Sequence, residues 1–152
     1  MRKLRATEAD TTIKLRNLLE YEFITSLYVG THLQEMTFII DTGSDLTWLP
    51  TEDCPKHECP RDNYHYHKSS AFKKTSFMSS IKYVIGEAKG ILMSDHFSLK
   101  RSNQNTIRNL EFLGVYETKN LESFRSDGLL GLGPKKKYKN GKLKSDQHVI
   151  VE

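Results

Sequence analysis

The chain has 152 residues, about the size of one domain, and 37% of them are hydrophobic. No apolar run approaches the roughly 18 residues that cross a bilayer, so the sequence predicts no membrane segment. The net charge of +4 arises after residue 134, because residues 1–134 contain 17 Lys and Arg against 17 Asp and Glu. A basic binding face is therefore not expected on the folded body.

The first 20 residues are polar until an apolar end that includes Leu15, Leu18 and Leu19. This segment reads either as a short amphipathic helix or as an unstructured, propeptide-like lead-in. Residues 1–5 are positively charged like the start of a signal peptide, but no apolar region follows them, so secretion is not indicated.

From residue 21 to residue 134 the pattern is that of β-strands, with no convincing helical period. Two runs on either side of Gly30 predict a first hairpin. A second hairpin is expected about a turn at residues 86–89. The predicted strands are residues 23–29, 34–40, 80–85, 90–93 and 107–116. The expected fold class is therefore mostly β.

The stretch Asp41-Thr42-Gly43-Ser44 follows three apolar residues without a break. A carboxylate at the end of a buried strand needs hydrogen-bond partners. Thr42 and Ser44 offer hydroxyl donors, and Gly43 lets backbone N–H groups approach. Such donors favour the ionised carboxylate. The stretch predicts either a functional carboxylate in a cleft or an ordinary Asx-turn.

Two cysteines, Cys54 and Cys59, lie in a loop with several prolines. Their close spacing suits a small disulfide loop, and the alternative is a zinc site that also uses His57, His65 and His67. The usual C-x₂-C and H-x₃-H spacings are absent, so no metal is expected.

Residues 135–152 form a separate, lysine-rich segment, which we interpret as a solvated loop or tail. It contains one aromatic residue, Tyr138. Nucleic-acid binding usually needs more aromatic interleaving, so nucleic acid is not an expected partner.

Five stretches of the chain form an ordered pattern. They are Asp41-Thr42-Gly43-Ser44 with Trp48, the Cys54 and Cys59 pair, Tyr66 with Ser69-Ser70 and Phe72, residues 83–92, and residues 127–132. In this order they resemble the N-terminal lobe of a pepsin-like (family A1) aspartic endopeptidase. The resemblance covers roughly residues 21–134. It implies a single acid-protease lobe, the N-terminal half of a bilobal fold, present in incomplete form.

The resemblance implies an aspartic endopeptidase that needs no cofactor. Asp41 would be one of two aspartates that activate a water molecule for attack on a peptide carbonyl. Ser44 would hydrogen-bond the outer oxygen of Asp41, beside Gly43. Thr42 would stiffen the cleft floor by bonding to the other lobe.

Other residues receive supporting roles from the same resemblance. Tyr83 would close over the substrate on a flap hairpin, and the indole N–H of Trp48 would hold it. Ile39 and Leu129 would line an apolar side-chain pocket. Cys54 and Cys59 would form the disulfide of a small loop.

Some features depart from the family pattern. Only one Asp-Thr-Gly is present, so a second lobe or partner chain is needed to complete the pair of aspartates. His32 stands where the family usually has proline, Val84 and Ile85 replace small flap residues, and the sequence after residue 134 lacks the usual helix and strand.

These departures predict little or no proteolytic activity for the chain alone. The resemblance itself implies peptides or proteins as substrates. The alternative is a catalytically inactive peptide-binding lobe or a truncated gene product. The family suggests a secreted, lysosomal or vacuolar protein.

Overall fold

The computed structural model describes residues 13–18, 20, 22–59, 61–83, 86–103 and 105–134. In this part of the chain the only helical element is a turn of 3-10 helix at Tyr66–Lys68, and no helix is long and apolar enough to cross a membrane. The strands are β1 (Arg16–Leu18), β2 (Glu22–Val29), β3 (Gln34–Asp41), β4 (Trp48–Pro50), β5 (Lys73–Lys82), β6 (Glu87–Ser98), β7 (Thr106–Lys119) and β8 (Gly128–Gly131).

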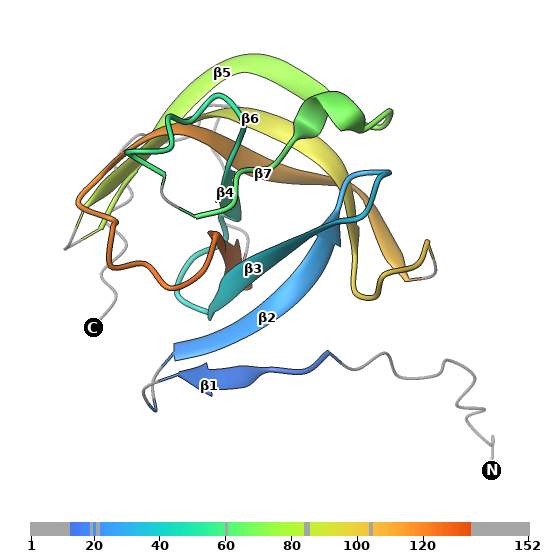
Figure 1. Cartoon of the computed structure of the whole chain (residues 1–152), viewed down its shortest axis with the longest axis horizontal. Coiled ribbons are helices and arrows are strands. Elements are labelled where there is room, and N and C mark those ends of the chain that lie inside the picture. Colours follow the sequence, from blue (N-terminus) through green and yellow to red (C-terminus); the bar gives the residue numbers. More distant parts are fainter. Residues whose placement is uncertain are drawn as a thin grey trace.

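All of these strands belong to one sheet in the order β1-β2-β3-β8-β4-β7-β6-β5. The sheet bends back on itself, because β2 also pairs with β6 through Tyr28↔Ser98 and Val29↔Phe97. In Figure 1 the long strands β5, β6 and β7 curve over β2 and β3. The pairings thus close a ring of six strands and leave β1 and β5 at the edges, which confirms the mostly β fold of a single lobe.

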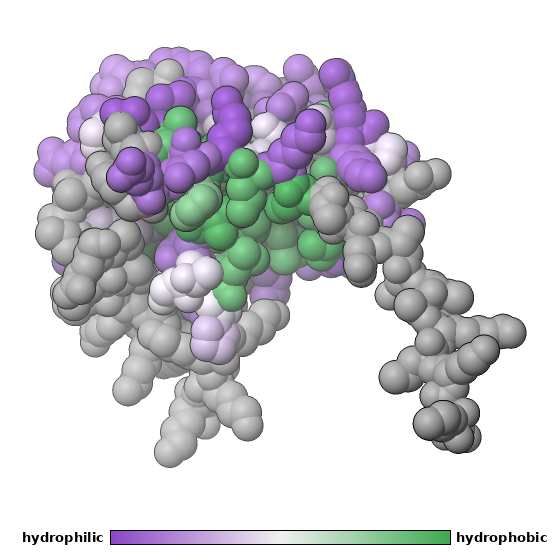
Figure 2. Space-filling view, turned by 90° about the horizontal axis from the view of Figure 1, so that it is seen from below, coloured by the Kyte–Doolittle hydropathy of each residue, from purple (hydrophilic) through white to green (hydrophobic). Residues whose placement is uncertain are grey.

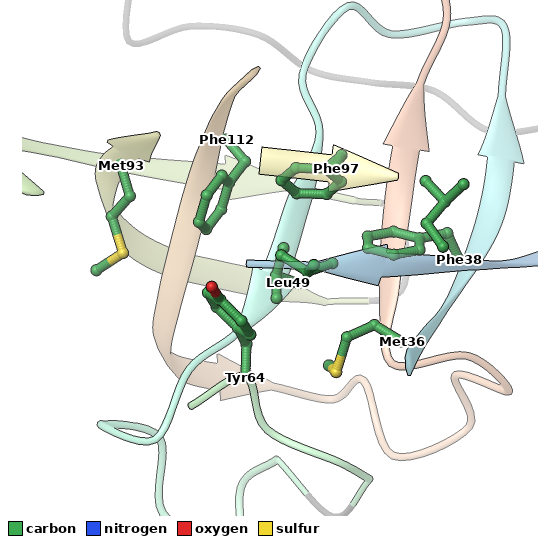
Figure 3. Close-up of a cluster of buried hydrophobic side chains, with 9 residues drawn as sticks. Met36, Phe38, Leu49, Tyr64, Met93, Phe97 and Phe112 are labelled. Carbon is green, nitrogen blue, oxygen red and sulfur yellow. The ribbon is translucent and has the colours of Figure 1, made fainter. Parts of the chain in front are cut away.

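Two clusters of buried side chains form the core, and β4 contributes to both. Leu49 points into the first cluster and its neighbour Trp48 into the second, as the alternation of a strand requires. Figure 3 shows the first cluster, with Phe97 and Phe112 close to Leu49. The first comprises Leu27, Val29, Met36, Phe38, Leu49, Tyr64, Met93, Phe97 and Phe112; the second comprises Trp48, Cys54, Cys59, Ile81, Ala88, Leu113, Val115, Leu121 and Leu129.

The first hairpin forms where the sequence predicts it. β2 and β3 pair antiparallel from Ile24↔Ile39 to Val29↔Gln34. Gly30 has a φ of 77°, and its carbonyl accepts the N–H of Leu33 at 3.1 Å. Glycine suits this position because residues with a side chain rarely adopt a positive φ.

The N-terminal segment differs from the expectation of a helix. β1 pairs antiparallel with the start of β2, from Arg16↔Ile24 to Leu18↔Glu22. The hydroxyl of Thr25 also donates to the carbonyl of Lys14 at 3.0 Å. The helix is wrong for these residues because the open edge of β2 offers backbone partners that the amphipathic pattern does not reveal. Residues 1–12 lie outside the described residues, and the division at residue 20 stays a prediction.

The second hairpin is longer than predicted and turns earlier. β6 already begins at Glu87, so the turn predicted for residues 86–89 is wrong. The chain reverses between Tyr83 and Gly86, where the Tyr83 N–H donates to the Gly86 carbonyl at 2.7 Å. A Cβ on Gly86 would lie 2.2 Å from the carbonyl oxygen of Lys119, so close packing against β7 explains the glycine.

Apolar side chains gather on one face of the molecule. Figure 2 shows this face, which is the side on which β1 and β2 lie in Figure 1. Leu15, just before β1, is 50% exposed, and Phe23 in β2 is 43% exposed. Large contiguous apolar surfaces of this kind are typical of sites that another protein segment covers.

Candidate active site

The carboxylate of Asp41 lies at the end of β3 and is held by the turn that follows. We call residues 41–47 the Asp41 turn. The backbone N–H of Gly43 donates to Oδ1 of Asp41 at 2.8 Å, and the hydroxyl of Ser44 donates to Oδ2. Ser44 is buried, whereas Thr42 and Gly43 are exposed. Both oxygens of Asp41 therefore have a donor, and Gly43 and Ser44 supply them as the sequence predicts. Among the described residues, the hydroxyl of Thr42, the other predicted donor, makes no hydrogen bond to Asp41. The carboxylate remains at the rim of the sheet.

The Asp41 turn is held in place by β8, the strand that pairs in parallel with β3. The N–H of Leu132 donates to the Asp41 carbonyl and the N–H of Gly133 to the Ser44 carbonyl, both at 2.7 Å. The N–H of Gly131 also reaches the hydroxyl of Thr47 at 3.2 Å. The apolar, glycine-rich stretch after Asp127 thus supplies backbone donors to this turn.

Three aromatic side chains, Trp48, Tyr83 and Phe124, pack together beside the Asp41 turn and are called the aromatic group below. The indole N–H of Trp48 donates to the hydroxyl of Tyr83, and the two rings lie 6.4 Å apart. Burial raises the pKa of the Tyr83 phenol, the Trp48 N–H lowers it, and the charge on Asp41 raises it. Phe124 packs against both rings, at 5.3 Å from Trp48 and 6.4 Å from Tyr83. Sequence reasoning missed Phe124, because an isolated aromatic residue in a loop matches no motif.

Ile39 and Leu129 are paired residues on neighbouring strands, β3 and β8. Side chains alternate along a strand, so Ile39 shares a face with Asp41. Ile39 is half-buried, and Leu129 is 3% exposed within the second cluster. Ile39 therefore keeps free surface on the side of the carboxylate, whereas Leu129 is covered by its own neighbours.

Asp127 is a structural residue that sequence reasoning left without a role. Its Oδ2 accepts the N–H of Thr37 at 2.7 Å and the Thr37 hydroxyl at 2.6 Å. Its Oδ1 accepts the N–H of Asp62 at 3.2 Å, and its own N–H donates to the Thr37 carbonyl at 3.0 Å. One carboxylate thus joins the middle of β3, the start of β8 and the loop after β4.

That loop, residues 51–68, is called the disulfide loop below; residue 60 lies outside the described residues. Cys54 and Cys59 form the disulfide that the family resemblance implies. The two sulfurs are bonded to each other and cannot bind zinc as thiolates. The alternative prediction, a zinc site that uses these cysteines, is therefore wrong. His57 is 81% exposed by its side chain and faces Glu58 at 3.6 Å.

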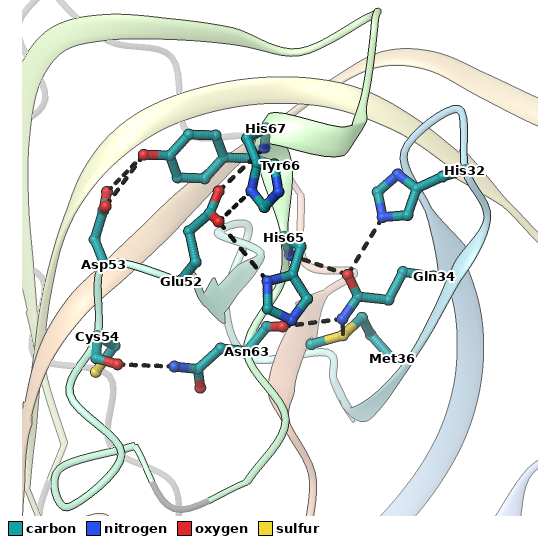
Figure 4. A network of polar contacts seen from close by, with 10 residues as sticks. All are labelled: His32, Gln34, Met36, Glu52, Asp53, Cys54, Asn63, His65, Tyr66 and His67. Carbon is teal, nitrogen blue, oxygen red and sulfur yellow. Dashed lines mark hydrogen bonds and ion pairs between the residues drawn. The ribbon is translucent and has the colours of Figure 1, made fainter.

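His32, one departure from the family pattern, lies in the turn between β2 and β3. Its ring stacks on Tyr64 with centroids 5.8 Å apart, and its Nε2 lies 3.3 Å from Oε1 of Gln34. It belongs to the polar network of Figure 4. Val84, Ile85 and the lysine-rich segment fall outside the described residues.

Comparison with known proteins decides the family. A family model for eukaryotic aspartyl proteases matches residues 22–150, which is most of the chain. The chain belongs to the eukaryotic aspartyl protease family. Members of this pepsin-like family are aspartic endopeptidases and act on peptide substrates.

Curated relatives of this aspartyl protease domain include chymosin and pepsin A. Chymosin of Ovis aries is 31% identical over 123 residues, which cover 80% of this chain and 32% of chymosin. Pepsin A of Suncus murinus is 38% identical over 93 residues, covering 59% and 24%, and pepsin A of Bos taurus is 32% identical over 122 residues, covering 78% and 32%. The chain thus spans about a third or less of the length of these relatives.

Proposed function

We propose that this chain supplies one half of the active site of an aspartic endopeptidase, with Asp41 as one of its two catalytic carboxylates. The observation that carries the proposal is the position of Asp41, whose two oxygens accept hydrogen bonds from Gly43 and Ser44 at the open end of β3. These donors hold the carboxylate in one orientation, as a group that positions a water molecule for attack requires.

The reaction needs a second carboxylate close to Asp41. Two carboxylates around one water molecule share a proton, because two negative charges at that distance are strongly disfavoured. The ionised carboxylate accepts a proton from the water as it attacks the peptide carbonyl, and the protonated one donates to the developing oxyanion. The sequence has a single Asp-Thr-Gly. The second aspartate therefore comes from another lobe, either further sequence or a partner chain.

Two features support a second lobe at this site. Thr42 is exposed directly beside Asp41, where its hydroxyl is free to bond across an interface. The apolar face of Figure 2 is a surface that gains stability when it is covered. A bilobal arrangement would meet both conditions.

The aromatic group beside the Asp41 turn suits substrate closure. Tyr83 lies at the tip of the β5–β6 hairpin and is steadied by the Trp48 N–H. Closure of this tip over a peptide would exclude water from the reacting carbonyl. Ile39 offers apolar surface for a substrate side chain, and Leu129 lies next to it on the neighbouring strand β8. Cleavage beside a large hydrophobic residue is the expected preference.

The test combines this chain with a lobe that carries a second catalytic aspartate. The chain is assayed alone, and again fused or mixed with the C-terminal lobe of a pepsin A, using a fluorogenic peptide between about pH 3 and 6. We expect cleavage only in the assembled form, and at least about a 10³-fold loss with Asp41→Asn. Asp62→Asn is the matched control, because Asp62 is exposed and its side chain lies in the disulfide loop.

Two results would contradict the proposal. The first is an assembled, folded protein that cleaves nothing in this range. The second is cleavage that survives Asp41→Asn. A third readout, peptide binding measured by calorimetry, separates the alternative: binding that persists in Asp41→Asn without any cleavage indicates a non-catalytic peptide-binding lobe.

A further inference from the structure

Three side chains with metal-binding atoms meet on the disulfide loop, away from the Asp41 turn. They are Glu52, His65 and His67, and one ligand atom from each lies within 4.8 Å of the others. Oε2 of Glu52 contacts Nδ1 of His67 and is 3.7 Å from Nδ1 of His65. Figure 4 shows the two imidazoles and the carboxylate converging. None of these residues has a part in the proposed peptidase chemistry.

The backbone holds both sides of this cluster in place. Residue Thr51 forms a parallel bridge with Tyr64, and the N–H of Glu52 donates to the Tyr64 carbonyl at 2.9 Å. Thr51 and Tyr64 are fully buried. The bridge therefore brings Glu52 next to the histidines although 12 residues separate Glu52 from His65.

Hydrogen bonds also orient the ligand groups themselves. The backbone N–H of His67 donates to Oε1 of Glu52 at 3.1 Å, which turns Oε2 towards the imidazoles. The backbone N–H of His65 donates to Oε1 of Gln34 at 2.9 Å. The Glu52 side chain is 21% exposed, while those of His65 and His67 are 46% and 57% exposed, so an ion has access from solvent.

We propose that Glu52, His65 and His67 bind one divalent transition-metal cation of the zinc class. Two imidazole nitrogens and one carboxylate oxygen are a donor set that zinc prefers, and water would complete a tetrahedron. Ligand atoms about 2.1 Å from a tetrahedral ion lie roughly 3.4 Å from one another. The ligand atoms now lie within 4.8 Å of one another, so separations have to change by about 1–1.5 Å to reach that arrangement, and the two imidazoles are exposed.

Other cations and donors fit this site less well. Calcium and magnesium prefer sets of oxygen ligands, and this cluster has two nitrogens. The carboxylate of Asp53 is engaged elsewhere, since the Tyr66 hydroxyl lies 3.0 Å and the Lys74 ammonium 3.2 Å from its Oδ2. The cysteines beside the cluster are joined in the disulfide.

A bound ion would join the end of β4 to the turn at Tyr66–Lys68. The disulfide closes the loop on one side of Glu52, between Cys54 and Cys59, and leaves residues 65–67 untouched. The ion would therefore close a second, independent loop of the chain. This inference does not rest on the proposed peptidase activity.

The test titrates the full, disulfide-bonded chain without a histidine tag with zinc chloride. Calorimetry is expected to give one ion per chain with a Kd at or below about 10 μM. NMR of the wild-type protein is expected to show ¹⁵N shifts at the Nδ1 atoms of His65 and His67. Glu52→Gln, His65→Gln and His67→Gln are each expected to weaken binding at least about tenfold.

His57→Gln and His148→Gln are the matched controls and should leave the affinity unchanged. His57 lies in the same loop, and His148 in the lysine-rich segment. Absence of zinc binding at 100 μM, shifts confined to other histidines, or undiminished binding in Glu52→Gln would each overturn the proposal. The NMR readout uses the wild-type protein, so it remains decisive if a variant fails to fold.

Discussion

Two loops flank β4, and they are held in different ways. The Asp41 turn precedes β4 and depends on backbone hydrogen bonds that Leu132 and Gly133 donate to the carbonyls of Asp41 and Ser44. The disulfide loop follows β4, and side-chain links add to its backbone hydrogen bonds. Among these links are the Cys54–Cys59 bond and the amide of Asn63, which donates to the Cys54 carbonyl at 2.8 Å. The Asp41 turn should therefore be sensitive to backbone crowding, and the disulfide loop to the loss of side-chain partners.

The largest expected loss of stability comes from a variant that disrupts the backbone support of the Asp41 turn. A Cβ on Gly131 would lie 2.6 Å from the backbone N of Leu46. Gly131→Ala should lower the free energy of unfolding by about 3 kcal/mol, because backbone atoms have to move. Urea denaturation measures the change.

Gly43→Ala is the matched variant within the same turn. Its added Cβ would meet only the Oδ1 of Asp41, at 3.2 Å, and a side-chain oxygen can shift. We expect a loss of about 0.5 kcal/mol or less. Equal losses for the two variants would show that β8 does not support the turn.

Asp127 joins β3 and the start of β8 to the disulfide loop, so its removal should destabilise the fold on that side of β4. Asp127→Ala leaves the N–H and hydroxyl of Thr37 without their acceptor and should cost about 2–3 kcal/mol. Asp62→Ala is the control, because Asp62 contacts Asp127 through its backbone N–H, which the variant keeps. Denaturation curves give both values; a loss below about 0.5 kcal/mol for Asp127→Ala would contradict this role.

The disulfide tests the other side of the comparison. The double variant Cys54→Ser, Cys59→Ser should lose about 2 kcal/mol, as expected for a loop this short. The amide NMR signals of residues 41–47 should stay in place, while those of residues 51–68 shift. Shifts of equal size in both loops would show that the two are coupled.

The smallest effect is a loss of stability at alkaline pH. Burial raises the pKa of the Tyr64 phenol, and its hydrogen bond to Asp95, at 2.6 Å, raises it further. The pKa of Tyr83 is raised as well, chiefly by burial. A raised folded-state pKa means that stability is complete below about pH 10, the unfolded value, and falls above it as the unfolded chain ionises.

Between pH 9 and 10.5 the loss should be about 0.8 kcal/mol for each of these two tyrosines. Tyr64→Phe should remove the share of this pH-dependent loss that arises in the disulfide loop. Tyr83→Phe should remove the share that arises beside the Asp41 turn. Denaturation at several pH values measures the slope. An unchanged slope in both variants would exclude these phenols as its cause.

Sequence reasoning predicts the Asp41 turn well because its chemistry is local. Asp41, Gly43 and Ser44 are near neighbours, and the hydrogen bonds follow from their order. The contact between Trp48 and Tyr83 was implied by the family resemblance, across a separation of 35 residues. The disulfide was one of two alternatives until the same resemblance favoured it.

The missed features depend on distant partners. Nothing in Thr37 or Asp127 alone shows that they meet across 90 residues. The strand β1 exists because the edge of β2 is open. The second hairpin reverses before Glu87 because β6 pairs with β7 from Glu87 onward. The cluster of Glu52, His65 and His67 has no recognisable spacing, since the bridge from Thr51 to Tyr64 creates it.

The parallel pairing of β3 with β8 also determines when the site can form during synthesis. Asp41 leaves the ribosome long before residues 128–133 are made, and contacts this far apart in sequence form slowly. Until then the apolar residues of β3 lack one neighbouring strand, which is the state that chaperones protect. Released chains truncated near residue 120 should be cut by protease around Asp41, and released chains extending beyond Pro134 should resist, because only the latter contain β8. Equal cutting of both would show that the turn forms without β8.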